Sequence, residues 1–103
     1  MRLGDVASTI KSSNAGASWL TFDIRFPDRA TYEHVVAAQV LTPAWFSATY
    51  GVPADDVAVY AYDPAIAIKV TIPRGGVTGG VDETDFDGVQ QFAPLLDLEL
   101  PAP

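Results

Sequence analysis

The sequence predicts an α/β fold of the α+β kind: a two-layer sandwich in which helices cover one face of a small antiparallel or mixed sheet. Three observations carry this prediction. Apolar residues first recur at helical spacing, they switch to strict alternation near residue 18, and two β-branched runs follow later in the chain. We expect the order α-β-α-α-β-β, followed by a C-terminal strand, within a single domain covering residues 1–103.

The first element is predicted to be a short amphipathic helix, because its apolar residues recur at i, i+3, i+4 and i+7. These residues are Leu3, Val6, Ala7 and Ile10. The segment should end at residues 14–16, since Asn14 and Gly16 tolerate the left-handed backbone conformation that stops helices.

The clearest strand covers residues 18–26, where the side chains alternate between two faces. One face carries Leu20, Phe22, Ile24 and Phe26. The other face carries Trp19, Thr21, Asp23 and Arg25. A proline at position 27 ends the strand.

Two helices are expected next. Asp28 is well placed to cap the first, and Thr42 followed by Pro43 predicts the start of the second, which should stop at Gly51. Both should cover the same sheet face. Residues 57–62 and 66–72 are β-branched and aromatic runs separated by Asp63-Pro64-Ala65, which predicts an antiparallel hairpin.

The last quarter of the chain divides into two parts. Residues 74–88 are rich in glycine and acid, lack apolar periodicity and are expected to be a flexible loop. Residues 89–100 are expected to be extended, because Leu96, Leu98 and Leu100 alternate with acids.

Composition limits the classes of function. Thirteen acids against six bases give a formal net charge of -7, which repels nucleic acids and anionic membranes, and the bases look scattered. The chain has no cysteine, so thiolate nucleophiles and Cys-ligated metals are excluded. No window reaches the roughly 18 apolar residues that a membrane span needs. We therefore expect a soluble, cytoplasmic protein without a nucleic-acid or membrane partner.

The chain shows no motif for a catalytic centre, a metal or a cofactor, and we expect no metal and no cofactor. His34 follows Glu33 in a predicted surface helix without a triad motif. The acids at 82–87 fail the EF-hand spacing, and the glycines at 75–80 do not continue into the Lys-Ser/Thr of a phosphate loop. Catalytic residues therefore stay unassigned.

A few residues are candidates for contact with a ligand or partner. Asp23 and Arg25 share a strand face and suit an anionic or acyl ligand, although an exposed ion pair explains them as well. Lys69 either has a lowered pKa in a buried position or protects a sheet edge. Gln90 and Gln91 need hydrogen-bond partners if they are buried, from the chain's own backbone or from another molecule.

Several motifs resemble a small uncharacterised bacterial domain family. They are LGDVA at 3–7, NAG at 14–16, WLTFDI at 19–24, YGVP at 50–53, DPA at 63–65, IKVTIPR at 68–74 and QQFAPLLDL at 90–98. Members of that family are encoded beside, or fused to, proteins similar to the acyclic terpene utilisation protein AtuA. The resemblance implies an accessory domain of a larger AtuA-like protein in the catabolism of branched acyl or acyl-CoA compounds. It implies no catalytic residues.

Three functions are compatible with these observations. In the first, the chain is an accessory subunit that binds an AtuA-like partner through residues 90–98, by adding a Leu-rich strand to its sheet, with self-association as a further possibility. In the second, it is a small enzyme subunit whose polar residues line a pocket. These residues are Asn14, Asp23, Arg25, Lys69, Gln90 and Gln91. In the third, it is a stand-alone ligand-binding module.

Overall fold

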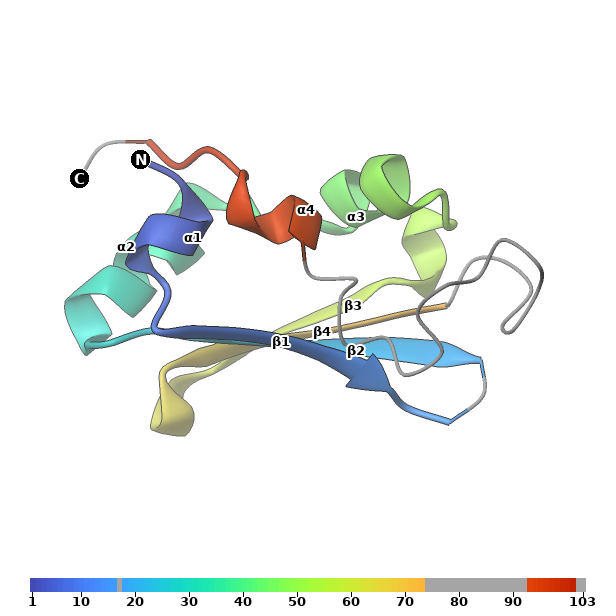
Figure 1. Ribbon diagram of the computed structural model, residues 1–103, viewed down its shortest axis with the longest axis horizontal. Coiled ribbons are helices and arrows are strands. Elements are labelled where there is room, and N and C mark those ends of the chain that lie inside the picture. The colour runs from blue at the N-terminus through green and yellow to red at the C-terminus, as the bar shows by residue number, and fades with distance from the viewer. Residues whose placement is uncertain (17, 74–92, 102–103) are drawn as a thin grey trace.

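The computed structural model describes residues 1–16, 18–73 and 93–101, and Figure 1 shows their arrangement. Their helices and strands follow in chain order as α1 (Leu3–Val6), β1 (Thr9–Asn14), β2 (Trp19–Arg25), α2 (Arg29–Ala38), α3 (Pro43–Tyr50), η1 (Ala54–Asp56), β3 (Ala58–Tyr62), η2 (Asp63–Ala65), β4 (Ala67–Pro73) and α4 (Ala93–Leu96), where η marks a 3-10 helix. The predicted loop at 74–88 lies outside the described residues.

The strands form one 4-stranded sheet in the order β1-β2-β4-β3, and all neighbouring pairs are antiparallel. Helices α1 to α4 lie on the same side of this sheet (Figure 1). The predicted fold class, a two-layer α+β sandwich with helices on one face, is confirmed. Strands β1 and β3 are the two edges, while β2 and β4 are central.

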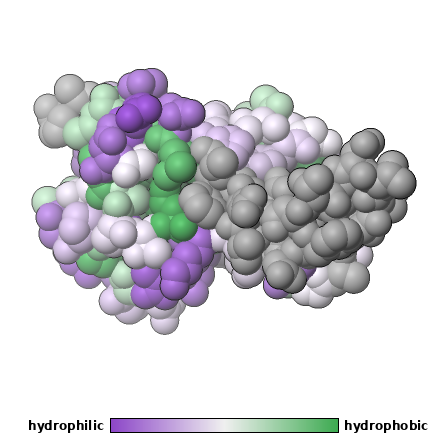
Figure 2. Space-filling view, in the orientation of Figure 1, coloured by the Kyte–Doolittle hydropathy of each residue, from purple (hydrophilic) through white to green (hydrophobic). Residues whose placement is uncertain are grey.

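The core lies between the sheet and the helices, as the alternation in β2 predicts. Leu20, Phe22 and Ile24 are buried, and Phe22 contacts Phe46 of α3 with ring centroids 5.5 Å apart. Strand β4 adds Ile68, Val70 and Ile72, while α2 adds Tyr32 and Val35. In side view, hydrophobic residues reach the surface between the two layers, with hydrophilic residues above and below them (Figure 2).

The starts of α2 and α3 follow the predicted capping pattern. The Asp28 carboxylate accepts a hydrogen bond from the Thr31 N–H at 2.8 Å, and the Thr42 hydroxyl accepts one from the Trp45 N–H at 3.1 Å. Helix α3 ends at Gly51, whose φ of 70° is a left-handed conformation that glycine adopts without strain. The Thr31 N–H bond is also the main reason why the pKa of Asp28 is lowered.

The helix predicted from Leu3 to its end at residues 14–16 is wrong beyond its first turn. Helix α1 ends at Val6, and residues 9–14 form β1 instead. Strand β1 pairs with β2 from Thr9 opposite Arg25 to Asn14 opposite Leu20. This long-range pairing outweighs a local helical pattern of only two turns, which is marginal without tertiary support.

The predicted C-terminal strand is also largely absent. Residues 93–96 form the helical turn α4, and the extended part reduces to one isolated bridge between Arg2 and Glu99. Beside that bridge, the Leu3 N–H donates to the Leu98 carbonyl at 2.8 Å and the Leu100 N–H donates to the Met1 carbonyl at 2.7 Å. The two ends of the chain therefore pair with each other.

None of the helices within residues 1–16, 18–73 and 93–101 combines the length and the apolar character that crossing a membrane requires.

Gly4 allows α1 and α4 to approach closely, and this generates a prediction. A Cβ atom at Gly4 would lie 2.9 Å from the Leu96 carbonyl oxygen, closer than normal packing permits. We expect Gly4→Ala to lower the free energy of unfolding by about 1–3 kcal/mol, the usual cost of overpacking. Helix propensity alone predicts the opposite sign, because alanine favours helices over glycine. Urea denaturation followed by circular dichroism measures the effect, and an unchanged midpoint would contradict the close approach.

Candidate functional site

The sheet face opposite the helices, called the open face here, carries aromatic and charged side chains. Trp19, Tyr60 and Tyr62 lie on it with 42%, 61% and 51% of their surface exposed. Their position follows from the alternation in β2 and β3, where every second residue points to the helix side and the residues between them point to the open face. Large exposed aromatic groups gathered on one face are typical of a surface that binds another molecule.

A row of charges crosses the centre of the open face. Strand register places Asp23 between Lys11 of β1 and Lys69 of β4. The Arg25 Nε lies 3.2 Å from the Asp23 Oδ2, and the Lys69 Nζ lies 5.7 Å from the centre of the Tyr62 ring. Among the described residues, the buried Oδ1 of Asp23 has no hydrogen-bond partner.

This row corrects the expectation that the bases are scattered. Lys11, Arg25 and Lys69 are three of the six bases in the chain, and strand pairing places them on one face. The face is therefore much more basic than a net charge of -7 suggests.

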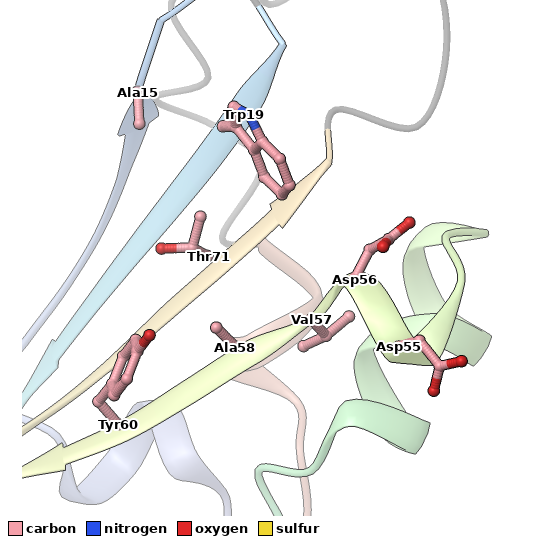
Figure 3. A pocket seen from close by; sticks show the side chains of 8 residues that line it. All are labelled: Ala15, Trp19, Asp55, Asp56, Val57, Ala58, Tyr60 and Thr71. Atoms are coloured by element: carbon pink, nitrogen blue, oxygen red, sulfur yellow. The ribbon is translucent and has the colours of Figure 1, made fainter.

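One end of the open face contains a shallow depression, called the aromatic pocket here (Figure 3). Trp19 and Tyr60 stand at its two sides, and the small side chains of Ala58 and Thr71 lie between them. Its volume is about 540 Å³, and its lining also includes Asp55 and Asp56 from η1, besides Ala15 and Val57. Aromatic faces beside carboxylates suit a cation, in particular the side chain of arginine or lysine.

A second depression, called the apolar groove here, lies on the helix side of β3, the edge strand that also borders the aromatic pocket. Its volume is about 440 Å³, and it runs between β3 and the helices α2 and α3. Its lining is mainly aliphatic: Val35, Val36, Gln39, Leu41, Thr42, Pro43, Val59, Ala61 and Ile68. Val36 is 38% exposed, so the groove presents apolar surface to solvent.

The C-terminal end of β3 is held against α2 by hydrogen bonds to Asp63, the residue that follows the strand. The Tyr32 hydroxyl donates a hydrogen bond to the Asp63 carboxylate, and the Arg29 Nη2 donates to the Asp63 carbonyl at 3.2 Å. Burial raises the pKa of Tyr32 to about 12, and the Asp63 carboxylate adds to the effect. Asp63 begins the turn between β3 and β4, so these bonds hold the edge strand against the helix layer.

The structure brings together three of the six predicted contact residues. Asp23, Arg25 and Lys69 lie on the open face. Asn14 does not join them, because its register partner is Leu20, a core residue, and Asn14 therefore lies on the helix side of the sheet. Gln90 and Gln91 are outside the described residues.

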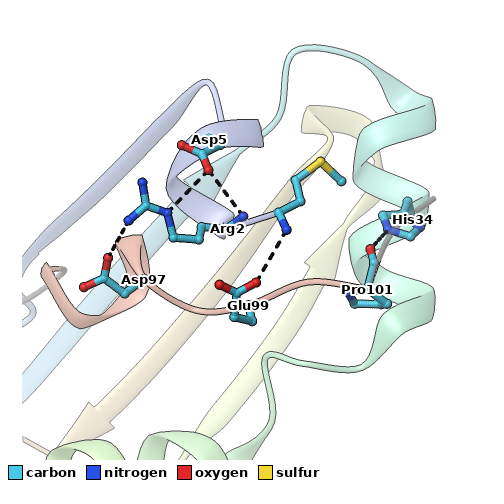
Figure 4. A network of polar contacts seen from close by, with 7 residues as sticks. Arg2, Asp5, His34, Asp97, Glu99 and Pro101 are labelled. Atoms are coloured by element: carbon cyan, nitrogen blue, oxygen red, sulfur yellow. Dashed lines mark hydrogen bonds and ion pairs between the residues drawn. The ribbon is translucent and has the colours of Figure 1, made fainter.

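The expectation that the C-terminal leucines form a strand left free for a partner is wrong for most of them. Leu95 and Leu100 are buried in the core, Leu98 packs against it, and Leu96 is 40% exposed. The segment is also tied to the N-terminus, since the Arg2 Nη1 lies 3.2 Å from the Asp97 Oδ1 (Figure 4). These leucines contribute to the chain's own fold, so they are not a free strand for docking.

His34 has a partner within the chain. Its Nε2 lies 2.9 Å from the Pro101 carbonyl oxygen, which ties α2 to the C-terminal segment (Figure 4). Within the part of the chain that the structure describes, no group of three or more His, Cys, Asp or Glu residues could hold a metal ion. The acids at 82–87 lie outside that part.

Sequence reasoning missed Asp55 and Asp56 as site residues. Their signal was present, because two adjacent acids directly precede an apolar strand. Their position beside Trp19 depends on the strand order, which places β3 next to β4 and β4 next to β2. No local pattern in the sequence reveals that order.

A family model described as Domain of unknown function (DUF4387) matches residues 3–99. Comparisons with curated proteins and with solved structures give no match. The match includes all four strands and every residue of the aromatic pocket and the apolar groove. A family described in this way brings no reaction with it, so function has to be argued from the site.

The bond between Tyr32 and Asp63 predicts a pH-dependent contribution to stability. Tyr32→Phe should lower the free energy of unfolding by about 1 kcal/mol near pH 7, because one hydrogen bond is lost. Since the pKa of Tyr32 is raised to about 12 in the folded chain from 10.0, its contribution is full below pH 10 and is lost as pH rises toward 12. The difference between wild type and variant should therefore shrink above pH 10. Urea denaturation at pH 7 and pH 11 measures it.

Tyr60→Phe is the matched control, because it removes a hydroxyl from an exposed tyrosine on β3, the strand that the Asp63 turn follows. It should leave stability at pH 7 unchanged. A Tyr32→Phe protein as stable as wild type at pH 7 would show that the hydroxyl does not hold the turn.

Proposed function

This chain belongs to the DUF4387 family, and we propose that it is an accessory small subunit or module of a larger AtuA-like protein. In this role it would support the catabolism of branched acyl or acyl-CoA compounds without carrying out the chemistry alone. The observation that supports the proposal is the open face. Within the part of the chain that the structure describes, the helices cover one side of the sheet only, and three exposed aromatic residues on the other side provide a surface for a second molecule.

The chemistry of the described residues supports binding over catalysis. A catalytic centre needs a nucleophile, a base and an orienting group within hydrogen-bond reach of one another. On the open face, Asp23 pairs with Arg25 through one oxygen, and the tyrosines are exposed to solvent. An arrangement of charged and aromatic groups on an open surface suits recognition, because aromatic residues and arginine are enriched in interfaces.

The proposal assigns the contact to the open face and its β3 edge instead of residues 90–98. Residues 93–96 are helical, and the Leu98 carbonyl already accepts a hydrogen bond from the Leu3 N–H, so this part of the segment does not present a free strand to a neighbour. Trp19 and Tyr60, by contrast, already present their rings to solvent in the isolated chain. Covering them would bury apolar area, which stabilises an interface by about 25 cal/mol per Å² before the costs of association are subtracted.

The charge row supports a second candidate, a module that binds an acidic ligand. Lys11, Lys69 and Arg25 surround Asp23, and together they offer more positive than negative charge. A carboxylate or phosphate group, such as those of an acyl-CoA, would find donors there. Saturable stabilisation of the isolated chain by acyl-CoA in a thermal-shift titration would favour this candidate, and a flat titration would count against it.

Complex formation tests the accessory role directly. The chain should co-elute with an AtuA-like protein of the same genome in size-exclusion chromatography, with light scattering giving the mass of a hetero-complex. Joint replacement Trp19→Ala and Tyr60→Ala should weaken the complex by about tenfold or more, because aromatic residues often dominate binding energy. Calorimetry measures the affinity.

Leu96→Ala is the control, since it also removes exposed apolar surface but lies in α4, on the helix side of the molecule. It should bind as wild type does. A chain that stays alone in the presence of that AtuA-like protein would refute the accessory role.

A further inference from the structure

We propose that the free edge of β3 receives an extended segment of the larger partner, in which basic and aliphatic side chains alternate. This inference rests on the proposed function, and it adds where the partner binds and what its docking segment looks like.

Strand β3 has the features of an open edge. It is the last strand in the sheet order and, among the described residues, pairs with β4 alone. Its 5 residues, Ala-Val-Tyr-Ala-Tyr, contain neither a charge nor a proline. Monomeric proteins usually protect such an edge with lysine, proline or a bulge, because its unpaired N–H and C=O groups recruit another strand. This edge lacks the side chains that would prevent pairing.

The two depressions lie on opposite sides of this one strand. Ala58 and Tyr60 line the aromatic pocket on the open face, while Val59 and Ala61 line the apolar groove on the helix side. Successive side chains of a strand point to opposite faces of a sheet. A strand added beside β3 would therefore direct alternate side chains toward the pocket and toward the groove. Main-chain bonds would supply affinity, and the two depressions would select the side chains.

The lining of each depression indicates which side chain it accepts. In the groove, Val36, Leu41 and Pro43 present aliphatic surface, which favours valine, isoleucine or leucine. In the pocket, Trp19, Tyr60 and Asp56 line one depression, and this combination of aromatic rings with a carboxylate favours arginine or lysine.

A second copy of the chain fits this edge less well. Antiparallel pairing of two β3 strands about Tyr60 would bring Asp56 of one copy toward Asp63 of the other, where like charges repel. No base would enter the aromatic pocket, because β3 contains none. We therefore assign the edge to a basic, extended segment of a different protein.

A short peptide provides the direct probe. Acetyl-Lys-Val-Arg-Val-Lys-Val-amide is titrated into the isotope-labelled full chain, and amide chemical shifts are followed by NMR. We expect saturable shifts in residues 58–62 and around Trp19, with much smaller shifts in β1. A peptide with Glu in place of each base should bind at least tenfold more weakly. A peptide that is N-methylated at alternate residues on its pairing side should lose binding, because it cannot donate to the edge.

Three variants of the chain separate the contributions. Ala61→Arg places a charge at an exposed position of the groove and should reduce peptide affinity at least tenfold. Asp56→Asn should weaken binding of the basic peptide about two- to fivefold, as expected for an exposed ion pair. Glu33→Gln removes one charge from an exposed position on α2 and is the matched control, with no change expected. Circular dichroism verifies that each variant folds.

The outcomes distinguish this inference from the proposed function. If Ala61→Arg abolishes binding of both the peptide and the AtuA-like protein, both proposals are supported. If the AtuA-like protein binds the wild-type chain and the Ala61→Arg variant equally well, the β3 inference is wrong and the accessory role stands. If the peptide binds at β3 but the AtuA-like protein does not bind, the inference holds and the accessory role fails. Concentration-dependent dimerisation that Ala61→Arg abolishes, or no saturable shift in residues 58–62, would overturn the β3 inference.

Discussion

The pairing of β2 with β4 is the constraint on which the rest of the structure depends. The register runs from Trp19 opposite Pro73 to Arg25 opposite Ala67, and it fixes which side chains of both strands face the helices. A slip of one residue would exchange the two faces and expose the core. Because the inward residues of both strands are aliphatic or aromatic, the outward residues are fixed as well. The core and the open face therefore arise from the same alternation.

Pairing of the two chain ends bears on the proposed docking site. The bridge between Arg2 and Glu99 brings α1 beside α4, so the C-terminal leucines complete the helix layer. A segment that already makes main-chain bonds within its own chain would have to give them up before it could add to another sheet. Strand β3 carries no such cost, because its outer edge is unpaired among the described residues. For the proposed partner, β3 is therefore a better candidate docking element than the C-terminal segment.

Features set by residues close together in the sequence could be predicted, whereas features set by pairing between distant segments could not. The capping of α2 by Asp28 and the alternation in β2 are local signals, and both were predicted correctly. Strand β1 was missed, because the pairing between Thr9 and Arg25 that creates it joins segments separated by a turn. The site divides in the same way. Asp23 and Arg25 share one strand, so their common face could be predicted. Asp55 and Asp56 line the same pocket as Trp19 only because β4 lies between β2 and β3 in the sheet.

The distribution of charge on the open face also favours one register for the proposed docked segment. Asp55 and Asp56 lie at one end of β3, while Lys69 lies across from Tyr60 near its middle. A basic side chain is therefore attracted at the η1 end and repelled toward Lys69. Screening at physiological salt limits these effects to about 8 Å, roughly the span of two or three strand residues. Charges on this scale can fix the register of an added strand, and register decides whether its aliphatic residues meet the groove or the solvent.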